Sequence, residues 1–155
     1  MQSSRFKSLG MAIGIAVDVP TVNRIVSSAV QCWPFSNRLQ RLVLPALHYS
    51  IADVQDFEFL LWYKTHACLG VAVWDPKFVG LDSSLGSVAL LHGLYVDAEH
   101  QREGVGKLLL DEVHRRAQSK DISSVYVKAE RFSSSYFEHL GYRRLPDDQG
   151  PGAVS

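Results

Sequence analysis

The feature that most constrains this chain is a glycine-bearing turn between a strand-like run and a helix-like segment. The turn is Gln101-Arg102-Glu103-Gly104-Val105-Gly106; the apolar run Leu90–Val96 precedes it and the amphipathic segment Lys107–Ser119 follows it. A turn that opens directly into a helix leaves several backbone N–H groups without intrahelical partners, backed by the positive end of the helix dipole. The sequence therefore predicts a strand-turn-helix unit with a phosphate site at the turn.

Length and charge exclude several classes of protein. The 155 residues suit one domain, residues 1–155, with residues 146–155 as a loose tail. Sixteen Lys and Arg balance sixteen Asp and Glu, so net charge favours neither nucleic acid nor a membrane surface as a partner. The apolar run 9–17 is too short to span a bilayer and lacks a signal-peptide cleavage pattern, so we expect a strand there.

Cysteine and histidine spacing gives no sign of a metal site. Cys32 and Cys68 lie far apart with no CxxC pair, which speaks against a disulfide scaffold or a structural zinc site. The six histidines show neither HxH nor HxxxH spacing. We therefore expect no metal, and a cytoplasmic location is the simplest setting.

Apolar periodicity predicts a mixed α/β chain. The expected strands are apolar or aromatic runs at residues 13–17, 57–63, 67–74, 88–96, 122–129 and 142–145. The expected helices are one that starts after Asp18, pieces within 36–55 broken at Pro45 and restarted near Ser50, 105–119, and 133–140 closed by Gly141. Residues 75–86 read as a loop, and 88–96 as a strand buried on both faces.

Side-chain directions follow from these assignments. In the helix 105–119 the residues expected to face the sheet are Val105, Leu108, Leu109, Val113 and Ala117, and those that can face water are Glu112, Arg115 and Arg116. In the strand, residues 90, 92, 94 and 96 are expected to share one face.

Two other nucleotide-binding patterns do not fit the turn. A Walker loop needs Gly at position 101 and Ser or Thr at position 108, where the chain has Gln101 and Leu108. A dinucleotide fingerprint from Gly104 needs Gly or Ala at position 109, which is Leu109, and no acidic residue follows at the required distance. The first pattern fails and the second is weak.

The pattern that fits is [Gln/Arg]-x-x-Gly-x-[Gly/Ala] after an apolar strand, which resembles the acetyl-CoA motif of the GNAT N-acetyltransferase superfamily. The resemblance extends from about Ile13 to Tyr142, with the lead-in Leu94–Asp97 and the closing run Tyr136–Tyr142. It implies a GNAT fold of the α/β (α+β) class, with a mixed, mostly antiparallel sheet splayed between its two central strands and about four flanking helices. It also implies an acyl-CoA-dependent N-acyltransferase with acetyl-CoA as cosubstrate.

The resemblance implies a set of cofactor contacts. The amides of residues 102–107 would hold the pyrophosphate, and the backbone of Leu94 and Val96 would contact the pantetheine arm and thioester. The residues expected at the cofactor are Leu94, Tyr95, Val96, Gln101, Arg102, Glu103, Gly104, Val105, Gly106, Lys107, Glu130, Ser133 and Phe137. The alternative is that Gly104 and Gly106 only permit a tight turn, although a plain turn rarely needs two residues without Cβ.

His92 is the expected general base. Its ordinary pKa of about 6.5 suits proton transfer from an ammonium nucleophile. The strand is similar to that of serotonin-type N-acetyltransferases, which carry a histidine here; a core histidine satisfied by a hydrogen bond is the alternative. The family's usual acid position holds Phe137, and adjacent Tyr136 points about 100° away on a helix. Tyr136 is the expected acid.

The acceptor is expected to be a primary amine of a small molecule or peptide, attacked directly in a ternary complex. Aromatic residues that could line its pocket, or belong to the core, are Trp33, Phe35, Trp62, Tyr63, Trp74 and Phe78. The alternative function is a non-catalytic acyl-CoA-binding module, which the unexpected Phe137 and Glu130 would suit. Relatives place two strands after the Gly-aromatic pair; here the second is absent, shortened, or supplied by a partner in a homodimer.

Overall fold

The computed structural model describes residues 9–78, 87–129, 133–145 and 153–154. Within these ranges the strands form one six-stranded sheet in sequence order, β1 to β6. The strands are β1 (Leu9–Ile13), β2 (Glu58–Lys64), β3 (Ala67–Asp75), β4 (Val88–Val96), β5 (Ser124–Lys128) and β6 (Ala153–Val154). Neighbouring strands are antiparallel except β4 and β5, which are parallel, so the predicted mixed, mostly antiparallel sheet is confirmed.

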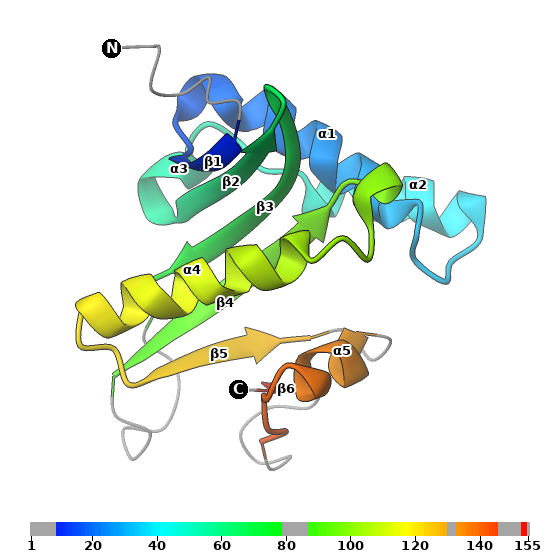
Figure 1. Ribbon diagram of the computed structural model, residues 1–155. Coiled ribbons are helices and arrows are strands. Elements are labelled where there is room, and N and C mark those ends of the chain that lie inside the picture. Colours follow the sequence, from blue (N-terminus) through cyan, green and yellow to red (C-terminus); the bar gives the residue numbers. More distant parts are fainter. Residues whose placement is uncertain (1–8, 79–86, 130–132, 146–152, 155) are drawn as a thin grey trace.

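Helices cover both faces of the sheet (Figure 1). They are α1 (Val19–Val30), α2 (Asn37–Leu47), α3 (Asp53–Asp56), α4 (Val105–Ser119) and α5 (Ser134–His139), with single 3-10 turns at Ala16–Asp18 and Ala98–His100. The apolar side of α1 packs with Phe59, Val71 and Val73 on one face. The apolar side of α4 packs on the other face with Leu60, Ala72 and Leu91.

The first strand lies earlier than predicted. Residues 13–17 are not a strand, because β1 ends at Ile13 and a 3-10 turn begins at Ala16. The Gly14 N–H donates to the Phe59 carbonyl at 2.7 Å, and the Ile15 N–H donates to Asp18 Oδ2 at 2.8 Å. The Asp18 carboxylate therefore turns the chain toward α1, and α1 buries the predicted face of Val22, Ile25, Val26, Ala29 and Val30.

Pro45 does not interrupt the second helix, which corrects the prediction for residues 36–55. The helix α2 runs continuously through Pro45, which lies in its last turn, and the Ser36 hydroxyl caps it by accepting from the Leu39 N–H at 3.2 Å. The predicted short helix near Ser50 is α3. The Ser50 N–H and hydroxyl both donate to Asp53 Oδ2, at 2.7 and 3.2 Å.

The bounds of α4 are as predicted, but its buried face differs by one position. Leu108 is 44% exposed, whereas Leu110 is buried beside Leu109 and Val113. The half-buried Arg116 joins Glu112 (2.8 Å) and Glu58 on β2 (3.0 Å), so Glu112 and Arg116 do not simply face water. The ion pair between Arg116 and Glu58 ties α4 to the sheet.

The strand β4 is not buried on both faces. Of its nine residues only Ala89, Leu91 and Tyr95 are buried. The parallel pairing with β5 ends at Leu91 and Val127, while β4 continues alongside β3 as far as Val96. The two central strands therefore diverge, as expected of a splayed sheet, and the C-terminal half of β4 faces an open cleft.

The end of the sheet also differs from prediction. Residues 142–145 form no strand, since Arg144 makes only an isolated bridge. Instead Ala153–Val154, part of the expected tail, pairs with Val127–Lys128 as β6. The last strand is thus shortened and supplied by the chain itself. Residues 79–86 of the predicted loop and 146–152 of the tail lie outside the described residues. No helix in the described part of the chain is long and apolar enough to cross a membrane.

Candidate active site

The turn between β4 and α4 has the backbone geometry of an anion cradle. Arg102 and Gly104 adopt left-handed conformations, with φ of 63° and 82°. An added Cβ on Gly104 would meet nothing within 4 Å, so glycine is favoured there by its φ and not by crowding. Gly104 is the N-cap of α4 and offers no side-chain cap, so amides of the first turn remain for a ligand.

The side chains of this turn are engaged with the protein. Gln101 Nε2 donates to the Val96 carbonyl at 2.7 Å, and Lys107 Nζ pairs with Asp111 at 2.8 Å. The Glu103 carboxylate contacts His100 Nδ1 at 3.1 Å. The side chains of Gln101, Glu103 and Lys107 thus have protein partners, and their predicted contact with a cofactor stays a prediction for the backbone amides.

Tyr136 lies directly over this turn. A Cβ on Gly106 would come within 2.5 Å of the Tyr136 hydroxyl oxygen, so a residue without Cβ is needed for their close approach. Tyr136 remains 42% exposed, and its partial burial raises its pKa. Phe137, at the family's usual acid position, is buried and packs edge-on against Tyr142 at 5.6 Å.

Two adjoining cavities form one cleft along the open half of β4. The larger, of about 400 Å³, is lined by the glycine turn, and the smaller, of about 210 Å³, is lined by His92. Trp33, Leu94 and Tyr136 line both. The cleft opens where β4 and β5 diverge, and it joins the anion cradle to the predicted base.

A β-bulge aims His92. Gly93 pairs with Val73 and Leu91 with Trp74, so His92 is an extra residue on β4. A bulge reverses the alternation of side chains. His92 contacts the aromatic residues of the α1 face, whereas Leu94 packs toward α4, and the expectation that residues 92 and 94 share a face is wrong.

His92 is held by aromatic neighbours but stays open to the cleft. Its Nδ1 lies 2.9 Å from the Tyr49 hydroxyl, and its ring centroid lies 4.6 Å from that of Phe57. The imidazole is an exposed group of the smaller cavity and not a core histidine. Burial by its neighbours lowers the pKa of His92, and the carboxylates of Asp53 and Asp75 partly offset this.

The structure brings most of the predicted cofactor residues to this cleft, and Ser133, the N-cap of α5, lines its smaller cavity. Glu103 lines neither cavity. Tyr95 and Val105 border the cleft, but their side chains are buried, Tyr95 on the α1 face and Val105 under α4. Glu130 lies outside the described residues. Among the ranges that the structure describes, no group of three or more His, Cys, Asp or Glu side chains could hold a metal ion.

Sequence reasoning missed Tyr49 and Phe57. They belong to the segment between α2 and β2, far from β4 along the chain, and no motif marked them. Of the six aromatic residues considered for an acceptor pocket, Trp33 lines the cleft. Trp74 is fully buried in the core, and Phe78 stacks on Tyr126 at 6.2 Å. The sequence alone does not show that the segment before β2, which carries Tyr49 and Phe57, packs against the bulge at His92.

The family model for an acetyltransferase (GNAT) domain matches residues 48–151. The chain belongs to this family. No curated protein matches the sequence.

Solved structures share the fold at low identity. One is the PaiA N-acetyltransferase from Thermoplasma acidophilum in complex with coenzyme A, with a TM-score of 0.72 at 15% identity over 94% of this chain and 96% of that chain. The ribosomal-protein-alanine N-acetyltransferase from Brucella melitensis biovar Abortus 2308 has a TM-score of 0.67 at 16% identity over 90% and 95%. An aminoglycoside acetyltransferase from an uncultured soil metagenomic sample, in complex with sisomicin, has a TM-score of 0.55 at 17% identity over 88% and 86%. These similarities support the GNAT fold.

Proposed function

We propose that this protein is an N-acetyltransferase that moves an acetyl group from acetyl-CoA to a primary amine by direct attack in a ternary complex. One observation carries the proposal: the anion cradle and His92 open into one cleft, bounded by Trp33, Leu94 and Tyr136. Such a cleft can hold an elongated anionic ligand at one end and present its far end to a base.

The residues of the cleft fit acetyl-CoA. The left-handed conformations of Arg102 and Gly104, just before the first turn of α4, are of the kind found where backbone amides bind a phosphate or diphosphate. The open edge of β4 beyond Leu91 offers extended backbone to the amide groups of a pantetheine arm. When bound, acetyl-CoA supplies the activated thioester. The PaiA relative was solved with coenzyme A, which supports the same ligand class here.

His92 accepts the proton of the attacking amine in this proposal. Because burial lowers its pKa, the imidazole is neutral at pH 7 and can act as a base. Its Nδ1 contacts Tyr49, so Nε2 is the ring nitrogen available to the amine.

Tyr136 donates a proton to the departing thiolate. Its hydroxyl lies at the junction of the two cavities, beside Gly106. Burial raises its pKa, which keeps the phenol protonated through neutral pH. This placement favours Tyr136 over the buried Phe137 as the source of the proton.

The acceptor is a primary amine on a small molecule or peptide. The smaller cavity has an apolar wall formed by Trp33 and Leu47, and the Asp53 and Asp75 carboxylates act electrostatically on His92. These charges favour the approach of a cationic amine. Of the similar structures, one is named for a ribosomal-protein alanine and another for an aminoglycoside, so both acceptor classes belong in the test.

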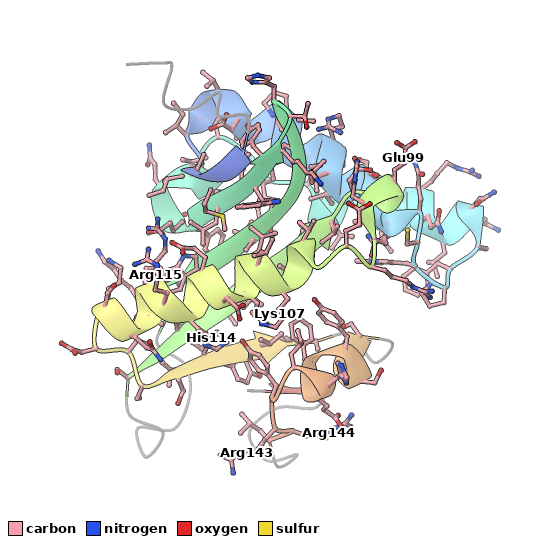
Figure 2. All side chains as sticks on the ribbon, in the orientation of Figure 1. Glu99, Lys107, His114, Arg115, Arg143 and Arg144 are labelled. Atoms are coloured by element: carbon pink, nitrogen blue, oxygen red, sulfur yellow. The ribbon has the colours of Figure 1, made fainter. Side chains whose placement is uncertain are left out.

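The test is an acetyl-CoA assay of thiol release with a polyamine, an aminoglycoside, an aromatic amine and an alanine-terminated peptide. His92→Ala is compared with His114→Ala, which changes a histidine on α4 outside the cleft (Figure 2). We expect the His92 variant to lose about 100-fold or more in turnover, the contribution of a general base, with coenzyme A affinity unchanged. Equal activity in the two variants would remove His92 from the mechanism.

A second candidate function is a non-catalytic acyl-CoA-binding module. The burial of Phe137 where relatives place their acid favours it. Tight coenzyme A binding without thiol release for any amine of the panel would support this alternative. Absence of coenzyme A binding, measured by calorimetry, would contradict both functions.

A further inference from the structure

Behind His92 lies a buried tyrosine that the proposed reaction has not used. We propose that Tyr49 is a positioning residue whose hydroxyl oxygen accepts the Nδ1 hydrogen of His92 and thereby leaves the Nε2 lone pair facing the cleft. The inference rests on the proposed function, in which His92 is the general base. Tyr49 and His92 are 43 residues apart in the chain, and their contact is 2.9 Å long.

Tyr49 is clamped by a neighbouring helix. Asn23 of α1 accepts from the Tyr49 N–H at 2.8 Å and donates to its carbonyl at 2.9 Å. The Tyr49 ring is 6% exposed and packs edge-on against Phe59 at 5.2 Å. A side chain held at both backbone and ring keeps its hydroxyl in one place, as a positioning residue requires.

Space for the hydroxyl is reserved on β4. A Cβ on Gly93 would lie 2.6 Å from the Tyr49 hydroxyl oxygen and 2.6 Å from the Tyr95 ring. Glycine at this position is therefore a matter of room, because its φ is not left-handed. The residue after His92 lacks a side chain so that Tyr49 can reach the bulge.

A third residue competes for the Tyr49 hydrogen. Burial first, and then Tyr95, with which Tyr49 also hydrogen-bonds, raises the Tyr49 pKa, so the phenol keeps its hydrogen through neutral pH. A phenol has one hydrogen. If that hydrogen goes to Tyr95, Tyr49 can only accept from His92, so Nδ1 carries the hydrogen and Nε2 is free of it.

The tautomer of neutral His92 decides whether Nε2, which faces the cleft, can act as a base. Only a ring nitrogen without a hydrogen has a lone pair that can take up a proton. The hydrogen bond made by Nδ1 determines which of the two nitrogens carries the hydrogen. The opposite direction, donation by Tyr49 to Nδ1, would place a hydrogen on Nε2. The Phe57 ring packs against the imidazole at an interplanar angle of 32° and restricts its rotation.

Other groups around His92 affect its charge but not this choice. The carboxylates of Asp53 on α3 and Asp75 on β3 act from a distance and raise its pKa. Lys128 of β5 and Tyr136 of α5 line the same cavity. These groups are unchanged in a Tyr49→Phe variant, which isolates the hydroxyl.

The test is a long-range proton–nitrogen NMR titration of the His92 ring in the full chain saturated with coenzyme A. The matched control is Tyr142→Phe. Tyr142 is 7% exposed, and its hydroxyl contacts His114 Nε2 at 2.5 Å outside the cleft. Tyr142 and His114 thus form a second tyrosine–histidine pair, and Tyr142 is about as buried as Tyr49.

In the wild type we expect the hydrogen on Nδ1, and this measurement needs no variant. Tyr49→Phe is expected to shift the neutral ring toward the Nε2–H form. It should also lower the His92 pKa, because the imidazolium loses a charge-assisted hydrogen bond. Tyr142→Phe should change neither. A wild-type ring with its hydrogen on Nε2, or a Tyr49→Phe spectrum equal to that of the control, would overturn the proposal.

Activity separates this inference from the proposed function. With an amine that the panel shows to be a substrate, Tyr49→Phe should lower kcat about tenfold, move the acidic limb of the pH profile to lower pH, and add no loss to His92→Ala. If His92→Ala is inactive but Tyr49→Phe keeps the wild-type acidic limb of the pH profile, only the positioning role of Tyr49 is contradicted. If His92→Ala is active, the proposed role of His92 as the base is contradicted instead.

Discussion

The two ends of the cleft are built in different ways. At the glycine turn, consecutive residues 101–106 supply backbone amides, and the side chains of Gln101 and Lys107 are occupied elsewhere. At the other end, His92, Tyr49 and Phe57 come from separate segments and act through their side chains. On the proposed function, an anion site is built from one short segment of the chain, whereas a positioned base needs residues that only folding brings together. Variants at the two ends should therefore separate binding from turnover.

After His92→Ala, the largest separation of turnover from binding is expected at Tyr136, which lines both cavities. Tyr136→Phe should lower kcat by about tenfold to 100-fold, the range of one proton donor, with coenzyme A affinity little changed. Because burial raises the Tyr136 pKa, the wild-type alkaline limb lies above the ordinary tyrosine range, and the variant should lose it. The measurement is kcat against pH, with Tyr126→Phe, a buried tyrosine of β5, as control. A parallel loss in both variants would contradict the role of Tyr136.

The next effect concerns the glycine turn, residues 101–106, at the end of the cleft formed by backbone amides. Gly104 and Gly141 both have positive φ, 82° and 101°, and a Cβ added at either would meet nothing within 4 Å. Alanine at either costs about 1–2 kcal/mol of stability. Gly104→Ala should also weaken coenzyme A binding about tenfold, since relief of strain turns the amides apart. Calorimetric titration of both variants tests this, and equal affinity in the two would exclude the cradle.

A smaller effect is expected from Phe57→Leu. Removing the ring packed against His92 should admit water, so the lowered pKa of His92 should rise toward its ordinary value. The base is active when neutral, so the acidic limb of kcat/KM should move to higher pH, with turnover at pH 7 reduced about threefold. Phe78→Leu, outside the cleft, is the control. If the acidic limb of kcat/KM moves to lower pH in Phe57→Leu, burial by Phe57 is not the cause of the lowered His92 pKa.

The smallest effect should leave both ends unchanged. Arg115 first, and then Arg116, hold the pKa of Glu112 below its usual value through hydrogen bonds. A lowered carboxyl pKa stabilises the fold above the unfolded pKa, and this contribution is lost as pH falls through the folded pKa. Glu112→Gln should therefore cost about 1 kcal/mol or less at pH 7 and nothing at acidic pH. Thermal unfolding measures this, and a change in coenzyme A affinity would show that the ion pair also shapes the cradle.

Local patterns in the sequence were sufficient for the helix α4, the hairpin of β2 and β3, and the turn between β4 and α4. Their signals are contiguous: an apolar period of 3.6, alternating runs, and glycines at fixed offsets. The family's resemblance then placed His92, Gly104 and Gly106 in one cleft. The limits of β1 and the continuity of α2 through Pro45 escaped prediction, because a capping carboxylate and packing outweighed local propensity.

The family, the strand-turn-helix unit and the candidate base His92 follow from the amino-acid sequence alone. The direction in which the His92 side chain points follows from the packing of distant segments. A one-residue bulge at His92 reversed the alternation of β4, and Asn23 held Tyr49 against it. The physical reason is that backbone conformation depends mainly on neighbouring residues, whereas the direction and tautomer of a side chain depend on groups brought together by folding.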